Sequence, residues 1–238
     1  MRMPGKDSTS RLARPRPRVL SRGAASSAAF ALLVVAPSCK GNSTTSFPDG
    51  LEPLDAVNQA HDPAPVAGDA HPEVLQTATG DTDDYSWAHG RGYVHASLTD
   101  TWAAMRDPDT CVDRRSVDEW THADTVDPKY RYAFSIHNVV HSVVTVEFDV
   151  TWREDVAEGT ADAPAVVAAR WQKVYGTNYI TLMGGSVIAR RVDDGTTELE
   201  LVEHLNASGK GSDTAETTMR DWFGSVVAKA HGRPLPTY

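Results

Sequence analysis

Strict alternation of apolar and polar residues is the clearest pattern in this chain, and it lies between residues 144 and 153. Val144, Val146, Phe148, Val150 and Trp152 occupy every second position, and five polar residues stand between or beside them. A period of two residues is typical of a β-strand with one buried and one solvated face, as in antiparallel sheets. The pattern therefore predicts an antiparallel sheet in this part of the chain.

Further strand patterns on both sides of this segment predict a sheet of about six to seven strands. They lie at residues 93–97, 117–125, 130–140, 166–175, 179–192 and 197–205. Gly184 and Gly185 predict a bulge or a sharp bend within one of them. Asp193-Asp194-Gly195 predicts a hairpin turn before the last strand.

Two segments have helical periodicity instead. Residues 99–106 follow the first strand, with Thr99 as the expected N-cap, and Pro108 stands just beyond their end. At residues 214–231, six apolar side chains from Met219 to Ala230 share one broad helical face. One short helix, a run of strands and a long terminal helix predict an α+β domain whose sheet is covered by that last helix.

This order of elements resembles the START-like, or helix-grip, superfamily (SRPBCC), which includes polyketide cyclase/dehydrase-like and Bet v 1-like proteins. Residues 94–107 look like its first strand and helix, residues 171–176 like its central strands, and residues 197–204 with the terminal helix like its closing elements. The resemblance covers about residues 91–233. It implies a curved antiparallel sheet wrapped around the C-terminal helix, with an apolar cavity between them that holds a hydrophobic small molecule or a lipid.

The N-terminal segment has the layout of a bacterial lipoprotein export signal. Seven basic residues and one acidic residue lie within the first 22 positions, and residues 23–38 are uncharged and mostly apolar. That run is too short to span a bilayer as a folded helix. It ends in Ala36-Pro37-Ser38-Cys39, which resembles a lipobox, where the cysteine is acylated and becomes the new N-terminus. Ala36 and Ser38 also fit ordinary signal cleavage, so a secreted soluble protein is the alternative.

Composition divides the chain into a signal at residues 1–38, a tether at 39–90 and a START-like domain at 91–238. Five prolines interrupt the middle part, which is rich in Asp, Gly, Ala, Ser and Thr and has no hydrophobic period. Such a segment buries too little apolar surface to offset its ordering entropy, so we expect a disordered tether with a reach of roughly 40 Å. His61, His71 and His89 are expected to be solvated there.

Net charge argues against one class of partner. The whole chain carries −9, and removal of seven basic residues and one acidic residue with the signal leaves −15. A surface this acidic is repelled by phosphates, so nucleic acid is not an expected partner. The expected contact with a membrane is the lipid anchor at Cys39.

Glu203 is the polar residue whose position is hardest to reconcile with its charge. It has the same parity as Leu201 and Leu205, so a regular strand aims it inward. A buried carboxylate needs a partner or a raised pKa, and Arg170 is the candidate partner. A bulge that turns either residue to solvent is the alternative. His204 lies on the polar side of the same strand, where exposure or a catalytic role are the two options.

No cofactor or metal is expected, because the chain has no G-x-S-x-G, H-E-x-x-H or zinc-type cysteine spacing. Six aromatic residues are candidates for lining the cavity, with simple core filling as the alternative for each: Trp152, Trp171, Tyr175, Tyr179, Trp222 and Phe223.

The leading hypothesis is an envelope lipoprotein, anchored in the outer membrane and facing the periplasm, that binds a hydrophobic small molecule or lipid. One alternative is a cyclase, dehydratase or hydrolase that uses Glu203, Arg170 or His204 in the same cavity. A second is an interaction module with a filled core.

The lipobox generates the first testable prediction. Cys39→Ser should move the protein from the membrane to the soluble fraction, because no other segment of the sequence is expected to hold it there. Fractionation followed by a high-salt wash measures this. A variant that stays with the membrane would contradict acylation as the anchor.

Overall fold

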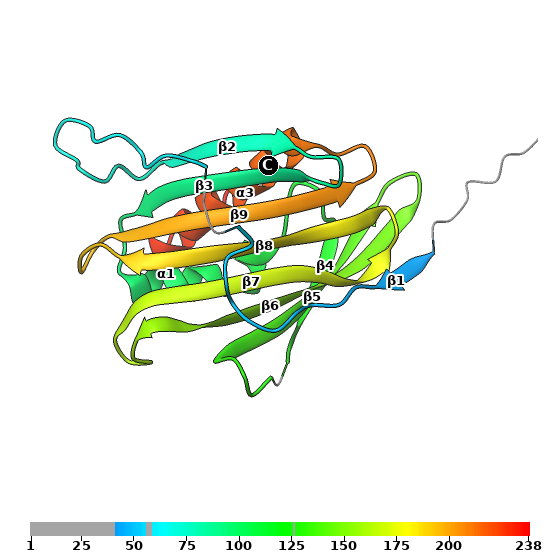
Figure 1. Ribbon diagram of the computed structural model, residues 1–238, viewed down its shortest axis with the longest axis horizontal. Coiled ribbons are helices and arrows are strands. Elements are labelled where there is room, and N and C mark those ends of the chain that lie inside the picture. The colour runs from blue at the N-terminus through cyan, green and yellow to red at the C-terminus, as the bar shows by residue number, and fades with distance from the viewer. Residues whose placement is uncertain (1–40, 56–58, 126) are drawn as a thin grey trace, which may run out of the picture. The chain divides into compact units, whose positions relative to one another are not determined.

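The computed structural model describes residues 41–55, 59–125 and 127–238, which build one antiparallel sheet and three helices (Figure 1). The strands are β1 (Asn42–Thr44), β2 (Leu75–Asp81), β3 (Ser86–Val94), β4 (Glu119–Asp124), β5 (Tyr132–His141), β6 (Thr145–Gly159), β7 (Pro164–Thr177), β8 (Ile180–Arg191) and β9 (Thr197–Ala207). The helices are α1 (Leu98–Met105), α2 (Pro108–Cys111) and α3 (Ser212–Ala230). Eight strands follow the order β2-β3-β9-β8-β7-β6-β5-β4, and β1 pairs with β7.

The expected α+β, helix-grip architecture is confirmed. The sheet is large and antiparallel, α1 follows the early strands, and α3 packs on β2, β3 and β9 and contacts α1. Helix α3 packs on the sheet through the apolar stripe predicted from the sequence, because Met219, Trp222, Phe223 and Val226 are all buried. Among the residues that the structure describes, no helix is both long and apolar enough to span a bilayer.

The expected tether at residues 39–90 is wrong for residues 41–55 and 59–90. Strands β1 and β2 and the first half of β3 lie there, so the ordered region does not begin near Arg91. Strand β3 is buried along both of its faces, and a strand covered on both sides shows no alternation of polar and apolar residues. Its pattern, including Ala88-His89-Gly90, therefore gave no sign of a strand.

Residues 41–55 form a strap across the outer face of the sheet, the face opposite α3 (Figure 1). The strap starts as β1 and is then held by side chains of the sheet. Arg170 Nη1 donates to the carbonyl of Glu52 at 2.8 Å, and the amide of Leu54 donates to Ser186 Oγ at 3.1 Å. Main-chain groups of the strap make these bonds, so it is ordered without the hydrophobic period that usually reveals a structured segment.

Pairing runs regularly through Gly184 and Gly185, so the bulge expected there is wrong; the irregularity of β8 lies between Ile180 and Leu182. Gly185 instead leaves room for the indole of Trp171, because a Cβ built on Gly185 would lie 1.9 Å from Cζ2 of Trp171. The Trp171 ring lies across this glycine and stacks on Trp152, with ring centroids 4.7 Å apart.

Helix α1 begins earlier than its pattern predicted. Its N-cap is Ser97 and not Thr99, because the hydroxyl of Ser97 accepts a hydrogen bond from the Asp100 amide at 3.1 Å. Such a cap satisfies one of the free amides of the first turn and is worth about 1 kcal/mol.

Gly185→Ala tests the stack of Trp171 on the sheet. The added methyl group forces the indole to move, and we expect a loss of about 1–3 kcal/mol in the free energy of unfolding. Urea unfolding of the two proteins measures the difference.

Gly195→Ala is the matched control, because its Cβ would meet only Asp193 Oδ1, at 3.8 Å. It should change the free energy of unfolding by less than about 0.5 kcal/mol. Equal losses in the two variants would contradict a specific role for Gly185.

Candidate functional site

A cavity of about 470 Å³ lies between the inner face of the sheet and α3. Small-molecule sites in proteins commonly have volumes of about 300–1,000 Å³. Strands β5 to β9 and helix α3 supply most of the lining, which is largely apolar and includes Ile136, Val150, Met183, Leu201, Leu205 and Met219. The sequence analysis did not name these residues as cavity candidates. Several of them nevertheless point to the same face of their strand as Trp152 or Glu203.

Four of the six aromatic candidates line the cavity: Trp152, Trp171, Tyr179 and Trp222. Trp152 and Trp171 form a stacked pair, and Phe134 lies parallel to Trp152 at a centroid distance of 6.0 Å. The cavity thus has a wall of flat aromatic rings on β6 and β7. Such a surface gives a large contact area to an apolar ligand.

Tyr175 and Phe223 do not line the cavity. The register of β6 and β7 shifts between Asp149 and Val150, and this irregularity turns Tyr175 outward, where it is 45% exposed. Phe223 is buried and faces β3, where a Cβ on Gly92 would lie 3.0 Å from its Cε2. Neither irregular register nor the direction in which a helix face points is visible in a simple alternation pattern.

Glu203 has the position that its parity predicts. It is 3% exposed, lines the cavity, and has no hydrogen-bond partner among the described residues. Burial raises the pKa of Glu203 to about 8, and the negative charge of Asp113 adds to the increase. At neutral pH the cavity therefore contains an uncharged carboxyl that can donate a hydrogen bond.

Arg170 and His204 lie on the outer face of the sheet, so the expected pairing of Arg170 with Glu203 is wrong. Neighbouring residues of a strand point to opposite faces, and Trp171 beside Arg170 faces the cavity. Arg170 instead binds the strap through Glu52, and burial lowers the pKa of its guanidinium. Arg170 and His204 therefore lie on the opposite face of the sheet from the Glu203 carboxyl and do not line the cavity.

His204, His89 and Asp55 form a cluster on that outer face, which we call the clasp. Both histidine Nε2 atoms lie 3.0 Å from Asp55 Oδ2, and His89 is 2% exposed, in contrast to the solvated residue expected. The amide of Gln59 donates to His89 Nδ1 at 3.0 Å. The His89 proton is thereby assigned to Nε2, from which it is donated to Asp55.

The same three side chains have the composition of a metal site. A metal ion would need the lone pair of His89 Nε2, and the bond from Gln59 keeps a proton on that atom. Burial also lowers the pKa of His89, so its imidazole is neutral at pH 7. The clasp therefore fastens the end of the strap to β3 and β9 by hydrogen bonds.

Glu154 is a second buried carboxyl, and it was missed although it shares the inward parity of Trp152. Trp102 Nε1 donates to its Oε2 at 2.6 Å, and burial raises the pKa of Glu154 to about 7. It lies beneath α1 and does not line the cavity. Its contact with α1 indicates a structural role.

Comparison with known proteins gives a likeness of fold. No family model matches the chain, and no curated protein matches it. Among solved structures, the chain is similar to the lipid transfer and protein localization domain of human StarD13 (DLC2), at 10% identity and a TM-score of 0.47, over 74% of this chain and 89% of that one.

It is similar to human StAR-related lipid transfer protein 5, at 10% identity and a TM-score of 0.45, over 68% and 83% of the two chains. It is also similar to the Zhui aromatase/cyclase from Streptomyces sp. R1128, at 14% identity and a TM-score of 0.37, over 62% and 87%. These are likenesses of fold at low sequence identity, and function is argued below from this chain's own residues.

The two raised pKa values predict a pH dependence of stability. Both carboxyls are protonated in the folded chain at pH values where the unfolded chain, with a pKa near 4.5, has released the protons. The free energy of unfolding should therefore fall as pH rises from about 4.5, up to about pH 7 for Glu154 and about pH 8 for Glu203, by up to about 1.4 kcal/mol per pH unit for each carboxyl.

In Glu203→Gln, the free energy of unfolding should fall less between about pH 5.5 and about pH 8 than in the parent protein, because the glutamine side chain does not titrate. Urea unfolding at the two pH values measures the difference. Glu158→Gln, a change at an exposed carboxylate, is the control and should retain the full decline. An unchanged decline in Glu203→Gln would mean that the carboxyl is ionised in the folded protein.

Proposed function

We propose that this chain binds a hydrophobic small molecule or lipid in the cavity between the sheet and α3. The observation that carries the proposal is the cavity itself, about 470 Å³ of space with a largely apolar lining. Protein interiors are packed to crystal-like density with few voids, so unfilled space of this size requires a function. It also argues against the alternative of an interaction module with a filled core.

The lining indicates the chemistry of the ligand. Its body should be apolar and should include a flat or ring-shaped part that lies against Trp152 and Trp171. The Glu203 carboxyl has no hydrogen-bond partner in the described residues, and as a donor it suits a carbonyl, ester or hydroxyl oxygen of the ligand. The indole N–H groups of Trp152 and Trp222, which also line the cavity, are buried without a partner in the described residues and are further donors. Asn138 also lines the cavity, but its amide group donates to the Ile136 carbonyl at 3.1 Å.

The membrane part of the proposal rests on the N-terminal sequence. The signal at residues 1–38 and Cys39 lie outside the described residues, and the lipobox-like end of the apolar run supports acylation of Cys39. The protein is then an envelope lipoprotein that faces the periplasm. Its partners are the bilayer, through the anchor, and the hydrophobic ligand.

An enzyme in the same cavity is the second candidate, and Glu203 favours it. A neutral carboxyl in a cavity is what a general acid requires. The cavity does not receive Arg170 or His204, which were the other catalytic candidates, so binding has the stronger support.

Binding of N-phenyl-1-naphthylamine, a neutral fluorescent probe, tests the cavity in the full chain with Cys39→Ser. Val146 lines the cavity, so Val146→Trp should obstruct it and weaken binding by at least about tenfold, or 1.4 kcal/mol. A fluorescence titration measures both affinities.

Val192→Trp is the matched control, because Val192 is exposed and does not line the cavity. It should bind the probe as the parent protein does. Failure of the parent protein to bind, or equal binding by the Val146→Trp variant when it is folded, would overturn the cavity as the ligand site.

A further inference from the structure

Most of the exposed part of the cavity lining gathers at one end of the sheet, and Ser116, between α2 and β4, is the other exposed lining residue. Ser142 and Val143 come from the turn between β5 and β6, and Ser208 and Lys210 from the connection between β9 and α3. Tyr179, which is half-buried, comes from the turn between β7 and β8. We call these five residues the rim.

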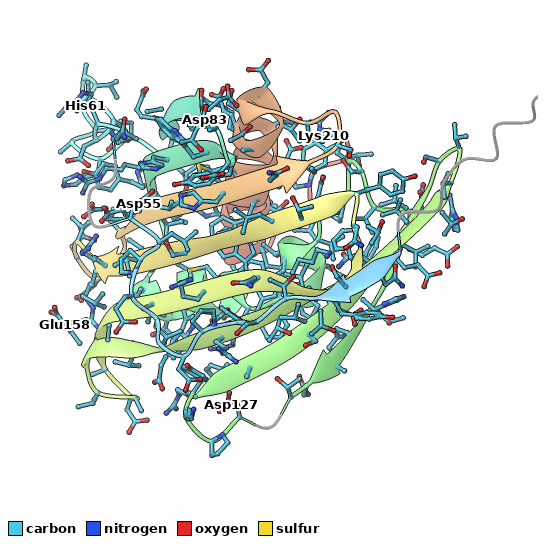
Figure 2. All side chains as sticks on the ribbon, turned by 45° about the vertical axis from the view of Figure 1, so that its right-hand side comes forward. Asp55, His61, Asp83, Asp127, Glu158 and Lys210 are labelled. Atoms are coloured by element: carbon cyan, nitrogen blue, oxygen red, sulfur yellow. The ribbon has the colours of Figure 1, made fainter. Side chains whose placement is uncertain are left out.

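The rim marks the open end of the cavity. Successive antiparallel strands reverse direction, so these three connections lie at the same end of the sheet. The connections between β6 and β7 and between β8 and β9, at the opposite end, supply no lining residue. Figure 2 labels Lys210 at the rim end and Glu158, near the end of β6, at the other.

The start of the strap is fixed beside the rim. Asn42 pairs with Thr177 in the β1–β7 ladder, and the amide of Asn178 donates to the carbonyl of Gly41 at 3.0 Å. Asn178 immediately precedes Tyr179 of the rim. Figure 1 shows β1 at this end of the sheet, with the strap leading away from it across the outer face.

Very little chain separates this point from the expected anchor. Cys39 precedes Gly41 by two residues, and two residues reach at most about 7 Å even when fully extended. The tether expected from composition would have had a reach of roughly 40 Å and would have left the domain free to turn. Because the strap is bound to the sheet, that freedom is lost.

We propose that acylation of Cys39 holds the domain with its rim against the bilayer, so that a hydrophobic ligand passes between the bilayer and the cavity without crossing bulk water. This inference rests on the proposed function, both on the anchor and on the cavity. It assigns the bilayer surface as the partner of the rim.

The side chains at the rim suit a bilayer surface. Val143 is 100% exposed at the tip of its turn, an unfavourable position in water and a favourable one at the boundary of headgroups and acyl chains. Lys210 supplies a positive charge that anionic headgroups attract, whereas the carboxylate in the cavity lining nearest to solvent, that of Asp113, is half-buried.

Lipid quenching of a site-specific fluorophore tests the orientation in the full, acylated protein. Val143→Cys and Glu158→Cys, each with Cys111→Ser to remove the competing thiol, carry nitrobenzoxadiazole in vesicles of phosphatidylcholine and phosphatidylglycerol. Along β6 the two positions are separated by roughly 40–50 Å, well beyond the range of contact quenching. Brominated lipid should quench the label at position 143 several-fold more than the label at position 158. Equal quenching, or stronger quenching at position 158, would overturn the proposal.

A linker variant tests whether the short connection sets this orientation. Thirty Gly/Ser residues inserted between Lys40 and Gly41 add a reach of roughly 30 Å while leaving the cysteine and the cavity intact. Quenching at position 143 should then fall toward that at position 158, with the protein still on the vesicles. Undiminished quenching would show that the connection does not orient the domain.

The outcomes separate this inference from the function on which it rests. Membrane binding that survives Cys39→Ser refutes the anchor, and absence of naphthylamine binding refutes the cavity. When both of those hold and the two labelled positions respond alike, the orientation alone is refuted.

Discussion

The alternation of side chains along β7 and β9 is the constraint on which the rest of this structure depends. Both faces of these strands are covered, the inner face by α3 and the cavity, and the outer face by the strap. Trp171 and Glu203 therefore face the cavity, while Arg170 and His204, their neighbours along the chain, hold the strap. One period of two residues thus separates the side chains that line the cavity from those that hold the strap.

This division explains what the sequence could and could not predict. Helix α3 and the segment at residues 144–153 each have one buried face and one face in solvent. Their hydrophobic patterns were therefore clear, and the α+β, helix-grip fold was predicted from them. Glu203 was placed correctly by parity. Arg170 was not, because a strand covered on both faces offers two interleaved sets of buried residues, and the pattern alone does not distinguish the set that faces the cavity.

The strap and β3 were missed for a related reason. Hydrophobic periodicity reports burial of apolar side chains, whereas the strap is ordered by main-chain bonds to Arg170 and Ser186 and by the clasp at Asp55. Glu154 and Glu203 illustrate the same limit, since both are buried carboxyls of inward parity. Only the structure shows that Trp102 donates a hydrogen bond to Oε2 of Glu154, whereas Glu203 faces open space.

The sequence separation of the strap's contacts has a consequence for how the chain folds. Asp55 meets His204, a residue 149 positions later, and β1 pairs with β7 across a comparable span. Contacts this distant in sequence form slowly, because the loop between them must be closed first. Although the strap precedes every other described segment in the chain, it has no surface to bind until β7, β8 and β9 are assembled. Its docking therefore completes folding, and an incompletely folded domain would be recognisable by a free strap and an uncovered outer sheet face.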